Sequence, residues 1–216
     1  MAENEGLSGP DDPSARRRAM VERQIRGRGI DDERILAAFE SVPRHLFVAP
    51  DLQDAAYEDR PLPIGESQTI SQPYIVARMA DLARIQPDDS VLEIGTGCGY
   101  AAAVLGELAD RVVSVEIRPR LANDARRRLE DLGYGNVRVL TGDDTVLDRG
   151  ETFDAIVVAA APGAIPESLE ERLADGGRLV IPVGGRFGQH LWTVDRHGDD
   201  LERTRHDPVA FVPLIE

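Results

Sequence analysis

Three glycines at alternate positions constrain this chain more than any other feature. Residues 91–100 read VLEIGTGCGY, an apolar segment of strand character that carries one acid and runs directly into Gly95, Gly97 and Gly99. Such glycines permit a tight turn and let a ligand approach the backbone. A helix that follows the turn directs its N-terminal N–H groups at the same ligand. The sequence therefore predicts a strand, a turn and a helix that belong to a nucleotide-type cofactor site.

The acid at Glu93 narrows the choice of cofactor. A carboxylate at the end of this strand would repel the pyrophosphate of a dinucleotide, whereas it suits a ligand that carries an amino group and a sulfonium. This favours S-adenosylmethionine over NAD. Glycine-rich turns between a strand and a helix occur in many unrelated proteins, so further evidence must come from the rest of the chain.

Strands and helices alternate regularly after residue 73. We expect helices at residues 73–82, 100–108, 119–132 and 166–173, and strands at residues 90–94, 112–116, 137–140, 155–158 and 178–183. This alternation is typical of an α/β protein with a mostly parallel, doubly wound sheet of Rossmann-like type, covered on both faces. Residues 190–195 and 203–214 flank a turn at residues 197–200 and predict a C-terminal antiparallel hairpin at the sheet edge.

The N-terminal third of the chain is less regular. Two helices are expected at residues 14–28 and 31–41. Residues 44–72 are rich in proline, glycine and turn residues, a length that is unusual for a connection without a function of its own. The chain is therefore divided into a disordered acidic tail at residues 1–13 and a single domain at residues 14–216, which comprises N-terminal helices and substrate-site loops (14–72), a Rossmann-like core (73–184) and the hairpin (185–216).

Charge and composition exclude several classes of function. The 216 residues include 25 basic and 39 acidic side chains, a net charge of −14, and every basic residue is arginine. An acidic surface opposes phosphate binding, so we expect no nucleic-acid partner. No segment approaches the roughly 20 apolar residues that a membrane-spanning helix needs, and the N-terminus has no signal-peptide pattern, so we expect a cytoplasmic protein without membrane association. The single cysteine, Cys98, agrees with a reducing compartment.

The same composition suggests adaptation to concentrated salt. A surface rich in aspartate and free of lysine is expected where salt screens like-charge repulsion to a few ångströms. A genome rich in G and C also replaces lysine with arginine, so composition leaves both explanations open. The four histidines do not pair with Cys98 or with carboxylates at metal-ligand spacing, and we expect no metal site; they are His45, His190, His197 and His206.

Acids follow three of the expected strands at the point where each one ends. In a doubly wound sheet the ligand lies beyond the carboxyl ends of the strands. Glu93 ends the first strand and Glu116 ends the second, 21 positions after Gly95, where an acid would grip ribose hydroxyls. Asp143 follows the third strand, between Gly142 and Asp144. The three positions together favour a Rossmann-type cofactor site over chance loop acids.

Several segments resemble the protein-L-isoaspartate (D-aspartate) O-methyltransferase family. The most specific is residues 65–79, GESQTISQPYIVARM, which is similar to the signature segment of that family. The resemblance extends from about residue 18 to the end of the chain, and its segments occur in the same order as in the family. The other similar segments are residues 42–48, 56–65, 93–100, 153–156, 176–184 and 211–214. The glycine turn is shared by most methyltransferases of this fold, whereas the TISQP segment is specific to this family.

The resemblance implies methyl transfer from S-adenosyl-L-methionine to the free carboxylate of L-isoaspartyl, and possibly D-aspartyl, residues in damaged peptides and proteins. The ester then closes to a succinimide, which starts repair. The resemblance makes Ser71 the active-site serine and implies substrate contacts from Thr69, Ser71, Val212 and Pro213. The cofactor-binding residues that follow from the glycine turn, the strand ends and the resemblance are Gln68, Thr69, Ile70, Ser71, Glu93, Gly95, Thr96, Gly97, Cys98, Gly99, Glu116, Gly142, Asp143 and Asp144. We expect a monomer.

One position departs from the family pattern. Asp144 stands where the family usually has glycine; if that position needs a positive φ, aspartate is among the better-tolerated substitutes, and it adds a charge beside Asp143.

Ser71 suits the chemistry that this resemblance implies. A carboxylate with a pKa near 4 is already ionised at pH 7, so it needs orientation rather than a general base. A hydroxyl can orient it by a hydrogen bond, although the position before Gln72 and Pro73 also suits a helix cap.

Three other functions remain open from sequence alone. One is a methyltransferase that acts on a small molecule, and another is a cofactor-binding module without catalysis. An NAD-dependent dehydrogenase is the least favoured, because Glu93 is unsuited and a chain without lysine lacks a Tyr–Lys pair.

Overall fold

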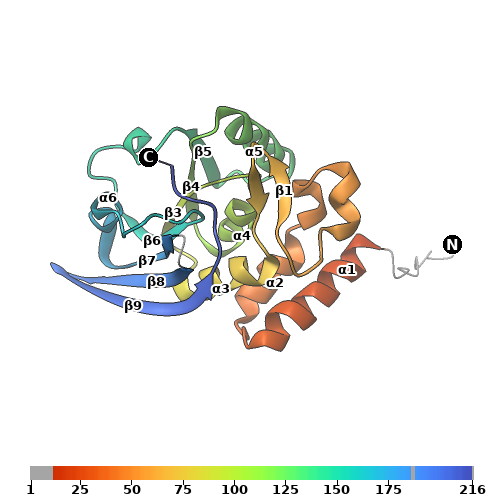
Figure 1. The fold of residues 1–216 in the computed structure, drawn as a ribbon, viewed down its shortest axis with the longest axis horizontal. Helices are drawn as coiled ribbons and strands as arrows, with labels where there is room; N and C mark the ends of the chain where they lie inside the picture. The colour runs from red at the N-terminus through yellow and green to blue at the C-terminus, as the bar shows by residue number, and fades with distance from the viewer. Residues whose placement is uncertain (1–11, 186–187, 216) are drawn as a thin grey trace.

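The structure is a computed structural model that describes residues 12–185 and 188–215 (Figure 1). The tail expected at residues 1–13 lies outside the described part except for Asp12 and Pro13. Asp12 caps helix α1 (Pro13–Met20) by accepting a hydrogen bond from the Ser14 N–H. The helical course continues as a π-turn (Val21–Ile25) and a 3-10 turn (Arg26–Arg28).

Helix α2 (Glu33–Ser41) begins after Asp32, whose carboxylate accepts from the N–H groups of Arg34 and Ile35. Both N-terminal helices therefore start at an aspartate that satisfies N–H groups of the first turn.

Seven strands form one sheet in the order β5-β4-β3-β6-β7-β8-β9. Strands β3 to β7 pair in parallel, whereas β8 and β9 continue the sheet in antiparallel fashion. Their bounds are β3 (Ser90–Ile94), β4 (Arg111–Glu116), β5 (Val137–Thr141), β6 (Phe153–Val158), β7 (Leu173–Gly185), β8 (Gly188–His197) and β9 (Asp200–Val209). The predicted fold class is confirmed: a mostly parallel doubly wound sheet with a C-terminal antiparallel hairpin. The first parallel strand, β3, lies between β4 and β6, so the strand order reverses there.

The two faces of the sheet are covered differently. Alternate residues of β3 enter different apolar clusters, with Val91 packing towards the helical side and Leu92 towards the side of Leu169. The helical side is covered by the N-terminal helices, α3 (Pro73–Ala83), α4 (Tyr100–Leu108) and α5 (Pro119–Asp131). On the other side α6 (Glu167–Glu170) is only one turn, shorter than the predicted 166–173, because Leu173 already begins β7. Among the described residues, no helix is long and apolar enough to cross a lipid bilayer.

The region at residues 44–72 contains regular structure that its sequence does not reveal. Two 3-10 turns (Arg44–Phe47 and Pro50–Ala55) precede a separate two-stranded hairpin, β1 (Leu62–Gly65) and β2 (Gln68–Ile70). In Figure 1 this hairpin stands beside the core, between α5 and the N-terminal helices.

The predicted strand at residues 203–214 extends too far. Strand β9 ends at Val209, and the segment after it crosses to Ala161, where Pro213 forms an isolated parallel bridge. This C-terminal segment thereby leaves the sheet edge and reaches the carboxyl ends of the central strands.

Candidate cofactor and acceptor site

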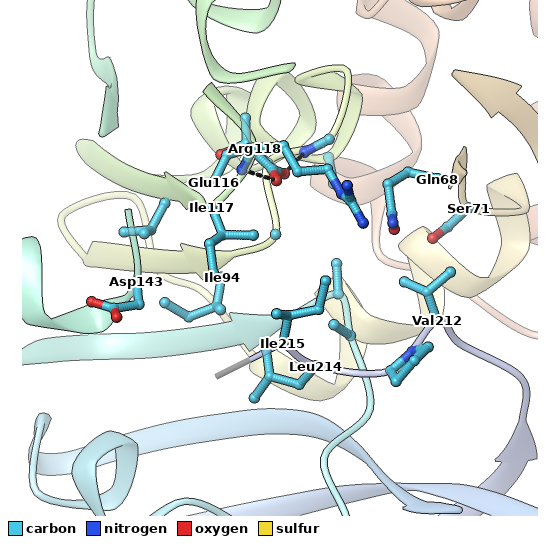
Figure 2. Close-up of a pocket in the computed structure, with 18 of the residues that line it drawn as sticks. Gln68, Ser71, Ile94, Glu116, Ile117, Arg118, Asp143, Val212, Leu214 and Ile215 are labelled. Carbon is cyan, nitrogen blue, oxygen red and sulfur yellow. Dashed lines mark hydrogen bonds between the residues drawn. The ribbon is translucent and has the colours of Figure 1, made fainter. Parts of the chain in front are cut away.

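A cavity of about 290 Å³ lies beyond the carboxyl ends of the central parallel strands (Figure 2). Ile94 ends β3, Glu116 ends β4 and Ala159 follows β6, and all three line the cavity. Further walls come from the β1–β2 hairpin, the segment after β5, the residues around α6 and the C-terminal segment. The cavity thus occupies the position where doubly wound sheets bind ligands.

The first two glycines of the turn face this cavity. Gly95 has φ 98° and Gly97 has φ 55°. The N–H groups of Gly95 and Thr96 both donate to the Val115 carbonyl, at 2.8 and 3.2 Å, which holds the turn on strand β4. A Cβ added at Gly97 would lie 3.2 Å from Ile64 Cδ1 of the hairpin. Glycine is therefore needed here for its conformation and for the close approach of β1.

The third glycine has a different task from the one expected. Gly99 does not line the cavity; it caps α4 with φ 91°, and a Cβ there would meet Leu129 and Ala125 of α5 at 3.3 and 3.4 Å. The predicted cofactor contact of Gly99 is thus not supported by its position. Its small size instead lets α4 pack closely on α5.

Glu93 is also absent from the cavity lining, contrary to the sequence-based expectation. Successive side chains of a strand point to opposite sides, and it is the next residue, Ile94, that reaches the cavity. Glu93 is fully buried and accepts a hydrogen bond from Ser114, which is linked in turn to Thr96 at 2.5 Å. Its Oε1 has no partner among the described residues. Burial raises the pKa of Glu93 to about 8, so this carboxyl is predominantly neutral at pH 7.

Glu116 lines the cavity, whereas the sequence had predicted that both Glu93 and Glu116 would face the ligand. Its Oε2 accepts from the Gly97 N–H at 2.8 Å and its Oε1 accepts from the Arg118 N–H at 3.0 Å, as the dashed lines in Figure 2 show. Each carboxylate oxygen retains a lone pair for a further donor. Glu116 therefore joins the glycine turn to the end of β4 and presents a carboxylate to the cavity.

The segment after β5 lies on the opposite side of the cavity from Ser71 (Figure 2). Asp143 and Asp144 both line the cavity there, together with Gly142. The Asp143 carboxylate accepts hydrogen bonds from the hydroxyl and the N–H of Thr145, and these hold its pKa below the usual value. Asp144 is not among the residues with positive φ. Aspartate is therefore conformationally acceptable where the family usually has glycine.

Residues 68–71 and the C-terminal segment form the other two walls. Gln68, Thr69, Ile70 and Ser71 all line the cavity. Helix α3 begins at Pro73 without a side-chain capping bond, and the Ser71 hydroxyl has no hydrogen-bond partner within the described residues. The helix-cap interpretation of Ser71 is therefore wrong, and its hydroxyl is available to a ligand.

Val212 and Pro213 reach the cavity because the C-terminal segment is tied to the loop after β6. The Ala161 N–H donates to the Val212 carbonyl at 2.8 Å, and the Leu214 N–H donates to the Ala161 carbonyl at 3.0 Å. These bonds fix the C-terminal segment at the cavity, where Val212 lies on the same side of the view as Ser71 (Figure 2).

The structure adds cavity residues that sequence reasoning missed. Ile117 and Arg118 follow the strand-end Glu116, and Leu214 and Ile215 continue the C-terminal segment. Ile117 and Ile215 are exposed apolar side chains, at 37% and 47%. Their signal in the sequence is proximity to residues already assigned to the site, since ligand contacts extend along the backbone on either side of a strand end.

The fold and the cavity define a class of protein: a Rossmann-like protein that binds a nucleoside cofactor. The sheet is doubly wound, two glycines lie on the cavity at its strand ends, and a carboxylate there can accept a hydrogen bond from a sugar hydroxyl. The comparison with known families makes this class specific. Residues 15–216 match the family model described as Protein-L-isoaspartate(D-aspartate) O-methyltransferase (PCMT). The chain belongs to this family.

Individual relatives agree along nearly the whole chain. The protein-L-isoaspartate O-methyltransferase of Methanoregula boonei is 50% identical over 210 residues, covering 97% of each chain. That of Methanoculleus marisnigri is 53% identical over 206 residues, covering 94% of each. A crystal structure of a Plasmodium falciparum protein described as such an enzyme, in complex with S-adenosyl-L-homocysteine, matches with a TM-score of 0.80 at 22% identity, over 92% of this chain and 98% of that one. This last likeness supports the fold.

Proposed function

We propose that this protein transfers a methyl group from S-adenosyl-L-methionine to the free carboxylate of L-isoaspartyl residues in peptides and proteins. The observation that carries the proposal is one cavity in which Ser71 shares the lining with Gly95, Gly97 and Glu116, while its hydroxyl has no hydrogen-bond partner among the described residues. The family membership of the chain and the names of its relatives support the same reaction.

The residues of the cavity fit this cofactor. Gly95 and Gly97 line the cavity with backbone alone, so a ligand can approach the turn closely. Glu116 offers free lone pairs to ribose hydroxyls, and Ile94 and Ile117 supply apolar surface for a base. When bound, S-adenosyl-L-methionine supplies a methyl group activated by a positively charged sulfur.

The protein contributes orientation and exclusion of water. The acceptor carboxylate is ionised at neutral pH, so no residue has to remove a proton. Ser71 donates a hydrogen bond that holds one carboxylate oxygen and leaves the other directed at the methyl group. Ile70 and Pro73 are buried on either side of Ser71 and limit the access of water. Alignment of this kind is worth several kcal/mol of the activation barrier, on the order of the gain from making a bimolecular step intramolecular.

The acceptor is an extended peptide in this proposal. Val212 and Pro213 line the same cavity as Ser71, and the hydrogen bonds to Ala161 fix their backbone. A peptide laid along this segment would bring an isoaspartyl carboxylate between Ser71 and the glycine turn. The methyl ester is then attacked by the following backbone nitrogen, which closes a succinimide and releases methanol without further help from the protein. The proposal includes D-aspartyl residues as additional acceptors.

The test is a methyl-transfer assay with two peptides that differ only in one residue, L-isoaspartate or normal aspartate. We expect a base-labile methyl ester on the isoaspartyl peptide and none on its partner. Equal labelling of both peptides would remove the specificity from the proposal. No labelling of either, with S-adenosyl-L-homocysteine still bound in calorimetry, would leave a nucleoside-binding protein with another acceptor.

We also propose that the protein acts in the cytoplasm as a monomer and is adapted to concentrated salt. The net charge of −14 and the absence of lysine support salt adaptation, since salt screens the repulsion between surface carboxylates. A melting temperature that rises between low and molar KCl is expected, and one that stays constant would contradict the adaptation. Sedimentation at the same salt concentrations tests the monomer.

A further inference from the structure

Ser71 directly follows the β1–β2 hairpin, which is poorly stabilised by itself. The hairpin forms a two-stranded sheet separate from the main one, and such hairpins are marginally stable in isolation. Its base is anchored by Leu62 and Ile70, which are buried at 0% and 3% exposure. Its turn is formed by Glu66 and Ser67, with φ 52° and 59°, a conformation unfavourable for residues other than glycine. The tip therefore needs support from outside the hairpin.

Arg118 supplies that support from the cofactor side of the cavity. It follows the end of β4 and caps α5, and its guanidinium points towards Gln68 in Figure 2. With the Gln68 amide turned so that its oxygen faces the guanidinium, that oxygen accepts from Nε at 3.2 Å and from Nη2 at 3.0 Å. Nη1 lies 3.8 Å from Glu66 Oε2 in the turn. One side chain thus contacts the hairpin at the turn and at the start of β2.

The backbone of Arg118 is fixed at the same time. Its N–H donates to Glu116 Oε1 at 3.0 Å, and the other oxygen of Glu116 accepts from Gly97. A continuous series of hydrogen bonds therefore runs from the glycine turn through Glu116 and Arg118 to Gln68. Only Thr69 and Ile70 separate Gln68 from Ser71.

We propose that Arg118 is a positioning residue for methyl transfer, which holds the strand from Gln68 to Ser71 in register with the glycine turn and Glu116. The proposal rests on the proposed function for its consequence in catalysis, although the contacts themselves do not depend on it. A displacement of Ser71 by a fraction of an ångström would misalign the acceptor carboxylate, to which such reactions are sensitive. The planar fork of the guanidinium suits two bonds to one oxygen, which a lysine ammonium cannot reproduce in the same geometry.

Arg120 provides a matched control. It lies two residues further along the chain, carries the same charge and reaches only Glu66, at 4.0 Å, with its side chain 80% exposed. It does not line the cavity. Comparing Arg118→Ala with Arg120→Ala therefore separates the fork on Gln68 from a general loss of positive charge near the turn.

The test combines hydrogen exchange with kinetics on the full chain. Arg118→Ala should speed backbone amide exchange in residues 62–71 and lower kcat about tenfold, the size expected when a charged hydrogen bond is lost, with a smaller change in peptide KM. Arg118→Lys should recover part of the kcat, and Arg120→Ala should match the native protein in both measurements. In a double-mutant cycle, the effects on exchange of Arg118→Ala and Gln68→Ala should be far from additive, because each removes the same contact.

Equal exchange in residues 62–71 for the native protein and Arg118→Ala would overturn the positioning role. So would an equal loss of kcat in Arg118→Ala and Arg120→Ala. If the native protein methylated neither peptide, the proposed function would fail, while the exchange and the double-mutant cycle would still decide whether Arg118 holds the hairpin.

Discussion

The substitution Glu93→Gln should change how stability depends on pH. Burial raises the pKa of this carboxyl from 4.5 to about 8. Between these two values the unfolded chain has lost the proton while the native protein retains it, so the free energy of unfolding falls as pH rises. At about 1.4 kcal/mol per pKa unit, the 3.5 units correspond to a loss of at most about 5 kcal/mol, complete once pH passes the folded-state pKa. Glutamine cannot ionise and should not show this loss.

The assay is urea denaturation of both proteins from about pH 5 to pH 9, with the difference in free energy of unfolding plotted against pH. We expect the free energy of unfolding of Glu93→Gln to rise by several kcal/mol relative to that of the native protein across this pH interval. The Ser114 hydroxyl still finds an acceptor in the glutamine oxygen, so its hydrogen bond survives. Glu40→Gln, at an exposed position of α2, is the matched control and should show no such gain. A difference between Glu93→Gln and native that stays constant with pH would refute the buried, proton-retaining carboxyl.

Three further substitutions test the cavity. Ser71→Ala should lower kcat about tenfold or more by removing a hydrogen bond to a charged acceptor, while the calorimetric Kd for S-adenosyl-L-homocysteine stays within a few-fold; a collapse of that binding would make Ser71 structural. Glu116→Gln should weaken the same Kd about tenfold, since it alters the bonds to both Gly97 and a ribose, and an unchanged Kd would place the ribose elsewhere. Gly97→Ala should cost about 1–2 kcal/mol in chemical denaturation, because alanine at φ 55° is strained and its Cβ meets Ile64 at 3.2 Å; native stability would contradict this.

The parallel core was predictable because its two physical signals agree. Most residues of β3 and β6 are buried on both faces, and α4 and α5 start at Gly99 and at Pro119, so the apolar pattern and these helix-start residues indicate the same boundaries. The specific segment at residues 68–73 also indicated Ser71, which lines the cavity. Local patterning is sufficient here because each element buries its own apolar residues against the same sheet.

The β1–β2 hairpin was not predictable from its own residues. Its strands have four and three residues, the first contains Pro63, and its turn uses Glu66 and Ser67 where glycine or asparagine would signal a tight hairpin turn. Support comes from Arg118, about 50 positions further along the chain. A contact between residues so far apart in the sequence leaves no periodic pattern in the hairpin that it stabilises.

Glu93 and Gly99 lie outside the cavity lining for the same reason. Each lies in a segment that forms the cavity, yet each faces away from it, towards Ser114 and towards α5 respectively. Sequence position identified the segments, whereas the direction of a side chain depends on the register of β3 and on the packing of α4. The ligand-facing carboxylate is consequently Glu116.

The most direct test of the account is a crystal structure of the protein with S-adenosyl-L-homocysteine and an L-isoaspartyl peptide. We predict ribose hydroxyls on Glu116, the sulfur beside the turn at Gly95 and Gly97, and the isoaspartyl carboxylate within hydrogen-bond distance of Ser71 Oγ, with the peptide along Val212 and Pro213. A peptide bound away from Ser71, or a nucleoside outside this cavity, would contradict it.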